Sequence, residues 1–310
     1  MPVRIVTDST ADLSPELVKT LNITVVPVYV RFGQTSYRDG IDINRDEFYD
    51  KLVNSRVHPT TSQPTPADFA RVYLEVAKDT DEIVSVHVSG KLSGTYNSAL
   101  RGKELAAEKC DIQVMDSQSV SMGLGLVTLA AARLAAAGQS LHKVIGEVDE
   151  AIANTHLLGV FDTLKYLLLG GRIGKAKALI GSLLNVKPVL SMRDGEFQPV
   201  GNVRTRARGI ERLIEFARSM PGIHELAVIH STTQEEAHRL KERLGSLVDS
   251  SHLHLARLGP ALGVHGGPGV LAVAVRKKVG AASSGEEEAE PVGHKINVPS
   301  LHLPKIKPRS

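Results

Sequence analysis

The first half of the chain alternates short apolar runs with helix-start signals, and this alternation constrains the fold more than any other feature. Ser14-Pro15 and Thr65-Pro66 each place a capping side chain before a proline, which is typical of the first turn of a helix. Strands that alternate with helices usually form a parallel sheet covered on both faces. We therefore predict an α/β fold with a Rossmann-like N-terminal domain over residues 1–155. Its strands are predicted at residues 3–6, 23–30, 82–88 and 111–115.

The second half of the chain carries a different pattern. Asp194-Gly195 lies between two apolar runs and is a strong β-hairpin signal. We predict a C-terminal α/β domain with a mixed or antiparallel sheet over residues 156–280. From residue 281 to residue 310 the composition shifts to serine, glutamate, proline and lysine, so we predict a disordered tail there. Elsewhere in this half, helices are predicted at residues 207–219 and 233–247, and strands at 225–230, 252–258 and 270–276.

Composition limits the kinds of ligand and compartment. The net charge is only +3 and the chain has no tryptophan, which argues against nucleic acid, since phosphates need a clustered basic face and bases need aromatic platforms. No run approaches the roughly 20 apolar residues of a membrane span. The single cysteine, Cys110, fits a reducing compartment, and we expect a cytoplasmic protein. Aromatic residues make up only 4% of the chain, so a large cavity would have aliphatic walls.

A glycine-rich turn, SGKLSGT at residues 89–95, joins a predicted strand to a predicted helix. Such a turn presents backbone N–H groups and the positive end of the helix dipole, which favours an anion. The turn lacks the spacing of a nucleotide-binding phosphate loop, so a nucleotide is poorly supported. Ser93 and Gly94 are therefore candidates for an anion site. Ser93 could equally serve only as a helix cap, and the turn alone leaves both interpretations open.

Two further polar clusters precede predicted helices. The first, TTSQPT at residues 60–65, contains Thr61 and Ser62 and on its own is explained by turn chemistry. The second contains Asp8 and Asp12, but two carboxylates without a nearby histidine or cysteine are weak metal ligands. We predict no metal site. Ligands of parallel sheets bind beyond the carboxyl ends of the strands, where several of these polar turns are predicted to lie.

Taken in order, short motifs along the chain resemble the DegV family. The resemblance runs from residue 3 to about residue 276, covers both predicted domains and excludes the tail. Each motif is weak alone, but seven in the same order make a chance match improbable. They are TDSTADL (7–13), TSQP (61–64), SG and SGTY (89–96), DS (116–117), GRI (171–173), KP (187–188) and HGGPG (265–269).

The resemblance implies a carrier that binds one long-chain fatty acid, such as palmitate, between its two domains. No other cofactor is implied. Some members resemble the binding subunit of a bacterial fatty-acid kinase, which presents the carboxylate to a separate ATP-dependent subunit. By the same resemblance, the carboxylate would be held by Thr61 or Ser62, together with Ser93 and the Gly94 N–H. The head-group or partner-facing positions would be Arg204 and His265, and the pocket-adjacent residues Ser9, Ser117 and Arg172.

Two function classes stay open at this point. The first is the carrier, and the second is an enzyme that acts directly on a carboxylate, as a kinase-like phosphotransferase or an acyl hydrolase. A self-sufficient kinase should carry a nucleotide loop and magnesium-binding carboxylates, and a hydrolase a nucleophile with its base; neither pattern stands out, so we predict no catalytic residue. Arg204, Arg208 and Arg212 recur every fourth residue, which indicates either a solvated basic face or a docking surface.

Overall fold

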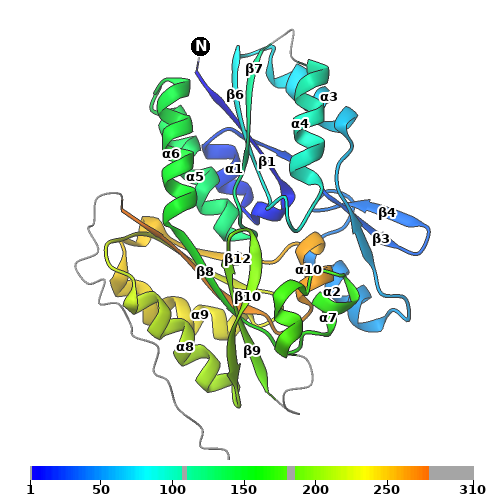
Figure 1. Ribbon diagram of the computed structural model, residues 1–310, viewed down its shortest axis with the longest axis vertical. Helices are drawn as coiled ribbons and strands as arrows, with labels where there is room; N and C mark the ends of the chain where they lie inside the picture. The colour runs from blue at the N-terminus through cyan, green and yellow to red at the C-terminus, as the bar shows by residue number, and fades with distance from the viewer. Residues whose placement is uncertain (1, 107–109, 180–185, 279–310) are drawn as a thin grey trace, which may run out of the picture.

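The computed structural model describes residues 2–106, 110–179 and 186–278, and the predicted tail at 281–310 lies outside these ranges. Figure 1 shows an N-terminal half (residues 2–154) above a C-terminal half (residues 155–278). The second sheet begins at Thr155 with strand β8. The predicted boundary near residue 155 therefore coincides with a change of sheet, and the division into two domains stays a prediction.

Four parallel strands form the sheet of the N-terminal half, in the order β2-β1-β6-β7, as the Rossmann-like prediction requires. Ser14 and Thr65 cap the first turns of α1 and α3, and a proline follows each of them, so both predicted helix starts are confirmed. The strands are β1 (Arg4–Asp8), β2 (Ile23–Val26), β6 (Glu82–His87) and β7 (Asp111–Asp116). The helices are α1 (Pro15–Thr20), α3 (Pro66–Val76), α4 (Thr95–Ala106), α5 (Met122–Ala136) and α6 (Leu141–Asn154).

A small antiparallel sheet, β4-β3-β5, lies beside this domain and was not predicted. The apolar run at residues 23–30 is broken at Pro27, because proline has no N–H to continue a ladder, and the chain leaves the first sheet there. Thr61 lies on β5, paired with Val30, where the sequence favoured a turn. The elements are β3 (Tyr29–Phe32), β4 (Thr35–Arg38), β5 (Thr60–Ser62) and α2 (Arg45–Asn54).

The C-terminal half contains a mixed sheet of order β10-β9-β8-β13-β11-β12, in which only β11 and β12 pair in parallel. Asp194 and Gly195 form the predicted hairpin turn, both with positive φ. The strands are β8 (Thr155–Val160), β9 (Lys187–Arg193), β10 (Glu196–Val203), β11 (Ile223–His230), β12 (Leu253–Arg257) and β13 (Leu271–Lys277). The helices are α7 (Lys165–Leu169), α8 (Arg206–Ser219), α9 (Gln234–Leu244) and α10 (Pro260–Gly266), with short 3₁₀ turns at Ser9–Ala11 (η1), Gly174–Leu179 (η2), Gly245–Leu247 and Ser250–His252.

The two sheets bury both of their faces. In β1, Ile5 packs with the residues of α5 and α6, whereas the next residue, Val6, packs with those of α3 and α4. In β8, Leu157 packs toward α5 and Leu158 toward α8 and α9. Successive strand residues point to opposite faces, so paired apolar residues indicate a sheet covered on both sides.

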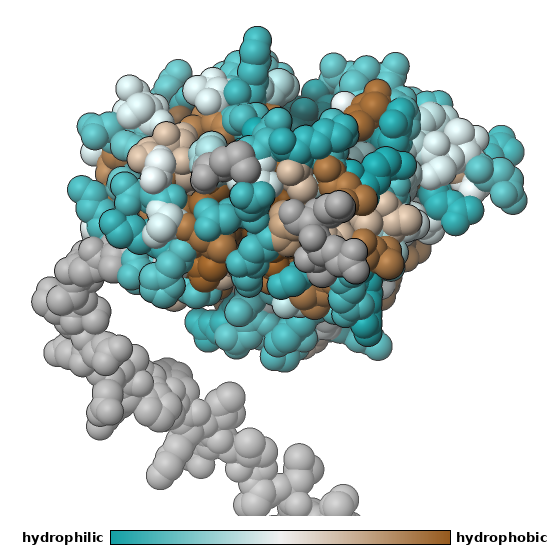
Figure 2. Space-filling view, turned by 90° about the horizontal axis from the view of Figure 1, so that it is seen from above, coloured by the Kyte–Doolittle hydropathy of each residue, from teal (hydrophilic) through white to brown (hydrophobic). Residues whose placement is uncertain are grey.

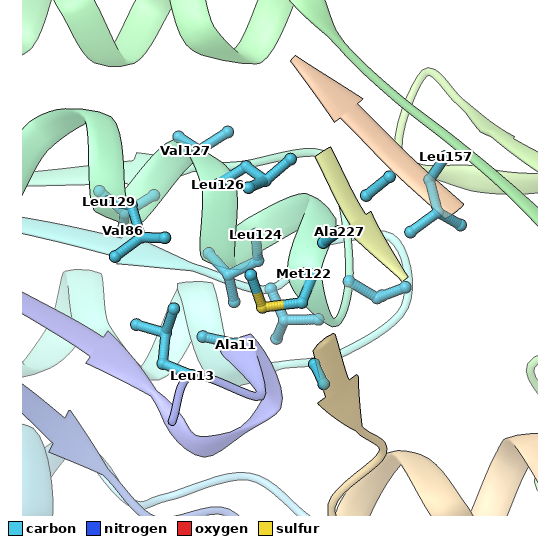
Figure 3. Close-up of a cluster of buried hydrophobic side chains, with 14 of the residues drawn as sticks. Ala11, Leu13, Val86, Met122, Leu124, Leu126, Val127, Leu129, Leu157 and Ala227 are labelled. Atoms are coloured by element: carbon cyan, nitrogen blue, oxygen red, sulfur yellow. The ribbon is translucent and has the colours of Figure 1, made fainter. Parts of the chain in front are cut away.

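Helix α5 joins the two halves into one core. Every residue from Met122 to Ala132 is buried, and a helix that is apolar all round must be enclosed. Figure 3 shows Leu124 and Leu126 of α5 among side chains of both halves, including Val86, Leu157 and Ala227. The two sheets therefore share a continuous hydrophobic core.

The surface is mostly hydrophilic on the face that Figure 2 shows, with hydrophobic residues visible mainly between hydrophilic ones. Among the described residues, no helix is both long enough and apolar enough to cross a membrane.

Candidate functional site

A cavity lies between the two halves, and residues of their shared core form part of its wall. The empty space there is about 840 Å³, which includes the part that is open to solvent. A mostly apolar cavity with a few polar groups suits a ligand that is itself largely apolar. The polar residues that line it are Thr10, Thr61, Ser93, Ser121, Arg172 and His265. The apolar lining includes Val28, Val88, Leu92, Val120, Leu157, Phe161, Leu167, Phe197, Ile229, Leu258, Leu262 and Val270.

His265 and Thr61 form a polar pair in this cavity. Nε2 of His265, on α10, lies 2.9 Å from Oγ1 of Thr61, on β5. Burial first, and then the positive charges of Arg172 and His58, lower the pKa of His265 to about 4. The imidazole is therefore neutral near pH 7. Its Nδ1 atom is buried, with no hydrogen-bond partner among the described residues.

Two glycines make room for aromatic rings beside this pair. A Cβ at Gly170 would collide with the imidazole ring of His265, and a Cβ at Gly267 would collide with the ring of Tyr166. Gly267 also has a φ of +70°, which side-chain-bearing residues rarely adopt. Glycine is therefore required at positions 170 and 267, because a side chain there would clash with a ring beside the cavity.

Arg172 is fixed at the mouth of the cavity by backbone carbonyls from both halves. Its Nε donates to the Leu92 carbonyl at 3.1 Å, and its Nη1 donates to the Gly170 carbonyl at 2.8 Å. Its Nη2 has no acceptor among the residues that the structure describes. Within the described part of the chain, the guanidinium therefore keeps one donor group, Nη2, that no acceptor contacts.

Ser93 combines the two roles that the sequence left open. Its hydroxyl accepts the Thr95 N–H at 3.2 Å, as a cap would, and it also lines the cavity. Gly94 lies in an adjoining open groove, which shares Ser93 and Arg172 with the cavity. The side-chain amide of Gln63 packs against Gly94, so close that a Cβ there would lie 2.9 Å from Gln63 Nε2. The motifs at residues 61–64 and 89–96 thus meet at the mouth.

Four other predicted site residues are not among the described residues that line the cavity. Ser62 follows Thr61 on β5, and adjacent strand residues point to opposite faces. Ser9 donates to Asp39 Oδ2 at 2.9 Å and accepts from Val28 N–H at 3.0 Å, so its hydroxyl is already occupied. Ser117 is buried in a separate cleft. Arg204 is exposed after β10, where a partner could reach it.

Several lining residues belong to no recognisable sequence pattern. Phe161 and Phe197 stack edge to face, with ring centroids 6.1 Å apart, yet neither belongs to a motif. Ser121 also lines the cavity, and its φ of +51° is uncommon for serine. Only contacts distant along the chain bring these residues to the site, so no local pattern could have found them.

The acidic residues near the N-terminus make structural hydrogen bonds. Asp8 Oδ2 lies 3.0 Å from His87 Nδ1 and accepts the Val88 N–H at 3.0 Å, in the interior of the first sheet. Asp12 accepts the Gly259 N–H. Among the described residues, no group of three or more histidine, cysteine, aspartate or glutamate side chains is placed to hold a metal ion.

The chain is thus an α/β protein with a parallel sheet, a mixed sheet and an apolar cavity with a polar mouth. The family model described as "Uncharacterised protein, DegV family" matches residues 2–278. The chain belongs to the DegV family, and the resemblance found in its motifs is confirmed.

Relatives and solved structures agree with this assignment. A DegV domain-containing protein of Deinococcus radiodurans is 37% identical over 285 residues, which cover 89% of this chain and 98% of the relative. A fatty-acid-binding DegV family protein from Thermus thermophilus is 35% identical, with a TM-score of 0.82 over 90% of this chain and 100% of its own. A stearic-acid-binding protein from Eubacterium ventriosum is 30% identical, with a TM-score of 0.81 over 89% and 98%. The predicted fold class is confirmed by these structures.

Proposed function

We propose that this chain binds one long-chain fatty acid, with the alkyl chain in the cavity and the carboxylate at its mouth. The observation that carries the proposal is the placement of Thr61, Ser93, Arg172 and His265 around one end of a cavity whose remaining lining, apart from Thr10 and Ser121, is apolar. The fatty-acid ligands of the similar solved structures support the same class of ligand.

The polar pair supplies donors that suit a carboxylate. In the tautomer that carries its proton on Nε2, His265 donates to Thr61 Oγ1, and the Thr61 hydroxyl hydrogen is free to point at a carboxylate oxygen. Arg172 Nη2 adds a charged donor, and hydrogen bonds to charged groups are roughly twice as strong as neutral ones. Ser93 and the Gly94 N–H adjoin the same mouth. A single carboxylate thereby has hydroxyl, amide and guanidinium donors.

The apolar cavity provides most of the binding free energy. About fifteen methylene-sized groups at about 0.8 kcal/mol each contribute on the order of 12 kcal/mol, before the cost of ordering the chain. Tight binding therefore needs no covalent step. The head-group contacts then fix the orientation and select a carboxylate over an alcohol.

The carboxylate at an open mouth also suits presentation to a partner. We infer that the chain delivers its fatty acid to a separate ATP-dependent kinase, with Arg204 on the partner-facing surface. The alternative is that the chain itself acts on the carboxylate. The absence of a phosphate-loop spacing at residues 89–95 favours the carrier.

One experiment separates these functions. Delipidated protein is loaded with labelled palmitate, passed through a gel-filtration column, and then given ATP and Mg²⁺ with or without a fatty-acid kinase. We expect palmitate to elute with the protein, and acyl phosphate to form only with the kinase. Arg204→Ala should retain palmitate and slow the kinase reaction. Acyl phosphate formed without kinase would favour the enzyme, and loss of palmitate on the column would contradict both.

A further inference from the structure

Two buried carboxylates of the N-terminal half hold the start of α10. Asp12 Oδ1 accepts the Gly259 N–H at 2.7 Å, and Asp39 Oδ2 accepts the Ala261 N–H at 3.3 Å. Asp12 follows the 3₁₀ turn η1, and Asp39 follows β4. Two separate loops therefore accept hydrogen bonds from the start of α10, a short helix of the other half. We refer to these two residues and their contacts with residues 259–261 as the Asp12–Asp39 clasp.

The two carboxylates converge on the same point. A Cβ built on Gly259 would lie 3.1 Å from Asp12 Oδ1 and 3.3 Å from Asp39 Oδ1. Their other partners are hydroxyls: Ser121 donates to Asp12 at 2.6 Å, and Ser9 donates to Asp39 at 2.9 Å. Asp12 is 4% exposed and Asp39 5% exposed, so water reaches neither freely.

The clasp is continuous with the wall of the cavity. Ser121, which donates to Asp12, lines the cavity, and so do Ala261, Leu262 and His265 of α10. Because α10 spans only Pro260–Gly266, a shift at its first turn moves His265 with it. The clasp thus holds the first turn of the helix that carries His265, the partner of Thr61.

The charges around the clasp leave it incompletely neutralised. Burial raises the pKa of Asp12 to about 6. Burial, and then the negative charge of Asp12, raise the pKa of Asp39 to about 7. Arg45 of α2 opposes both shifts, and Asp8 of β1 adds to that of Asp12. Tyr49, beside them on α2, is held neutral by burial, which raises its pKa, and Arg257 of β12 lies against its ring.

The sign of the pH effect follows from these directions. Both carboxyls hold a proton more firmly in the clasp than in water, where their ordinary pKa is 3.8. The contacts of the clasp are therefore most stable at low pH, and this stability is lost as pH rises through about 6 to 7. His265 is neutral throughout this range, so it does not contribute to the effect.

We propose that Asp12 and Asp39 are positioning residues of the fatty-acid cavity, which hold α10 closed while protonated and loosen it as they ionise. The ligand in this statement rests on the proposed function, whereas the clasp rests on the contacts above. Over about two pH units, ionisation of Asp39 alone would shift the balance between closed and open arrangements by up to about tenfold.

The test measures how fast cis-parinaric acid, a fluorescent fatty acid, leaves the full-length protein at about pH 6 and about pH 8. We expect release from the unmodified chain to be about tenfold faster at the higher pH. Asp39→Asn keeps an oxygen for Ser9 and Ala261 but cannot ionise, so its release should stay slow at both values. Asp42→Asn is the matched control, because Arg38 holds the pKa of Asp42 at about 2 and that exposed residue stays ionised throughout.

Equal release rates from the unmodified chain at both pH values would overturn the proposal. So would an Asp39→Asn variant that keeps the pH dependence. Failure to bind the probe at any pH would count against the proposed function instead. Thermal unfolding without ligand would then decide: relative to the unmodified chain, Asp39→Asn should raise Tm more at about pH 8 than at about pH 5, and equal shifts at both would refute the clasp.

Discussion

The two halves are joined by polar links at opposite ends of the parallel pair β11 and β12. Near the start of these strands, Glu225 is completely buried. Its Oε1 lies 2.6 Å from Arg133 Nη2, on α5, and 2.9 Å from His254 Nε2, and its Oε2 lies 3.0 Å from Arg276 Nη2. Arg276 also pairs with Glu147 of α6 at 3.0 Å. We call these five residues the Glu225 ion cluster. Beyond the end of β12, the Asp12–Asp39 clasp performs the same joining role with backbone amides and hydroxyls.

The partners decide how each link responds to protons. Burial alone would raise the pKa of Glu225, but hydrogen bonds from His254 and Arg133 and the charges of Arg133 and Arg276 lower it to about 2. Two arginines thus keep a buried carboxylate ionised at neutral pH. In the clasp, neutral partners stabilise the charge too weakly, and the carboxyls titrate near neutrality. The Glu225 ion cluster does not line the cavity, whereas the Asp12–Asp39 clasp holds the start of the helix that carries His265.

The largest effect is expected from breaking the Glu225 ion cluster. Glu225→Gln takes the carboxylate partner from half-buried Arg133 and leaves buried Arg276 with Glu147 alone. Removal of one partner from a buried ion pair costs about 3 kcal/mol or more of unfolding free energy. In the unmodified chain this contribution is complete above the ordinary glutamate pKa of 4.5, and it is lost as pH falls toward about 2. Urea unfolding near pH 7 measures the loss.

Glu211→Gln provides the matched control for that measurement. Glu211 pairs with Arg243 at 2.7 Å, but both side chains are exposed. The free energy of unfolding should therefore change little. If only the Asp12–Asp39 clasp titrates near neutral pH, the Glu225→Gln variant should still release ligand faster at about pH 8 than at about pH 6. Equal destabilisation by the two substitutions would show that burial does not distinguish these ion pairs.

A smaller effect, on affinity, is expected at the cavity mouth. Removing both hydroxyls with Thr61→Ala and Ser93→Ala takes away two donors to the carboxylate, each contributing about 1.5–3 kcal/mol when the acceptor is charged. Fatty-acid affinity should fall roughly a hundredfold or more, since about 1.4 kcal/mol is one decade, while burial of the alkyl chain preserves weaker binding. Titration of the folded double variant with a fluorescent fatty acid gives the affinity.

Ser62→Ala sharpens this test, because Ser62 is the next hydroxyl on the same strand and lies outside the cavity lining. Its removal should leave affinity unchanged. If Thr61 and Ser93 only stabilise the fold, the double variant would lose stability, with about 1 kcal/mol for the Ser93 cap, and keep its affinity. That outcome would place the carboxylate elsewhere.

The local elements of this chain could be predicted from its sequence because short-range chemistry sets them. Ser14 and Thr65 begin helices through their caps, and Asp194-Gly195 turns a hairpin through its positive φ values. The small sheet β4-β3-β5 was not predicted because its strands are only three or four residues long. In addition, β5 pairs with β3 from about 30 residues further along the chain.

The site was predictable only in part, for a related reason. Thr61, Ser93, Arg172 and His265 belong to motifs, and the fold brings them to one mouth. Asp39 lies in no motif, and its importance depends on Gly259, which is far away along the chain. Alternation along β5 separates Thr61 from Ser62, and a motif match cannot tell which of two adjacent hydroxyls faces a cavity.

The most direct test of the central claim is to identify what the cavity holds. Organic extracts of the purified full-length protein, analysed by mass spectrometry, should contain a fatty acid of roughly C14–C18, at about one molecule per chain. Delipidated protein should then gain thermal stability when such an acid is added, because a ligand that binds only the folded state raises Tm. An extract without fatty acid, together with no thermal shift from any long-chain acid, would contradict the account.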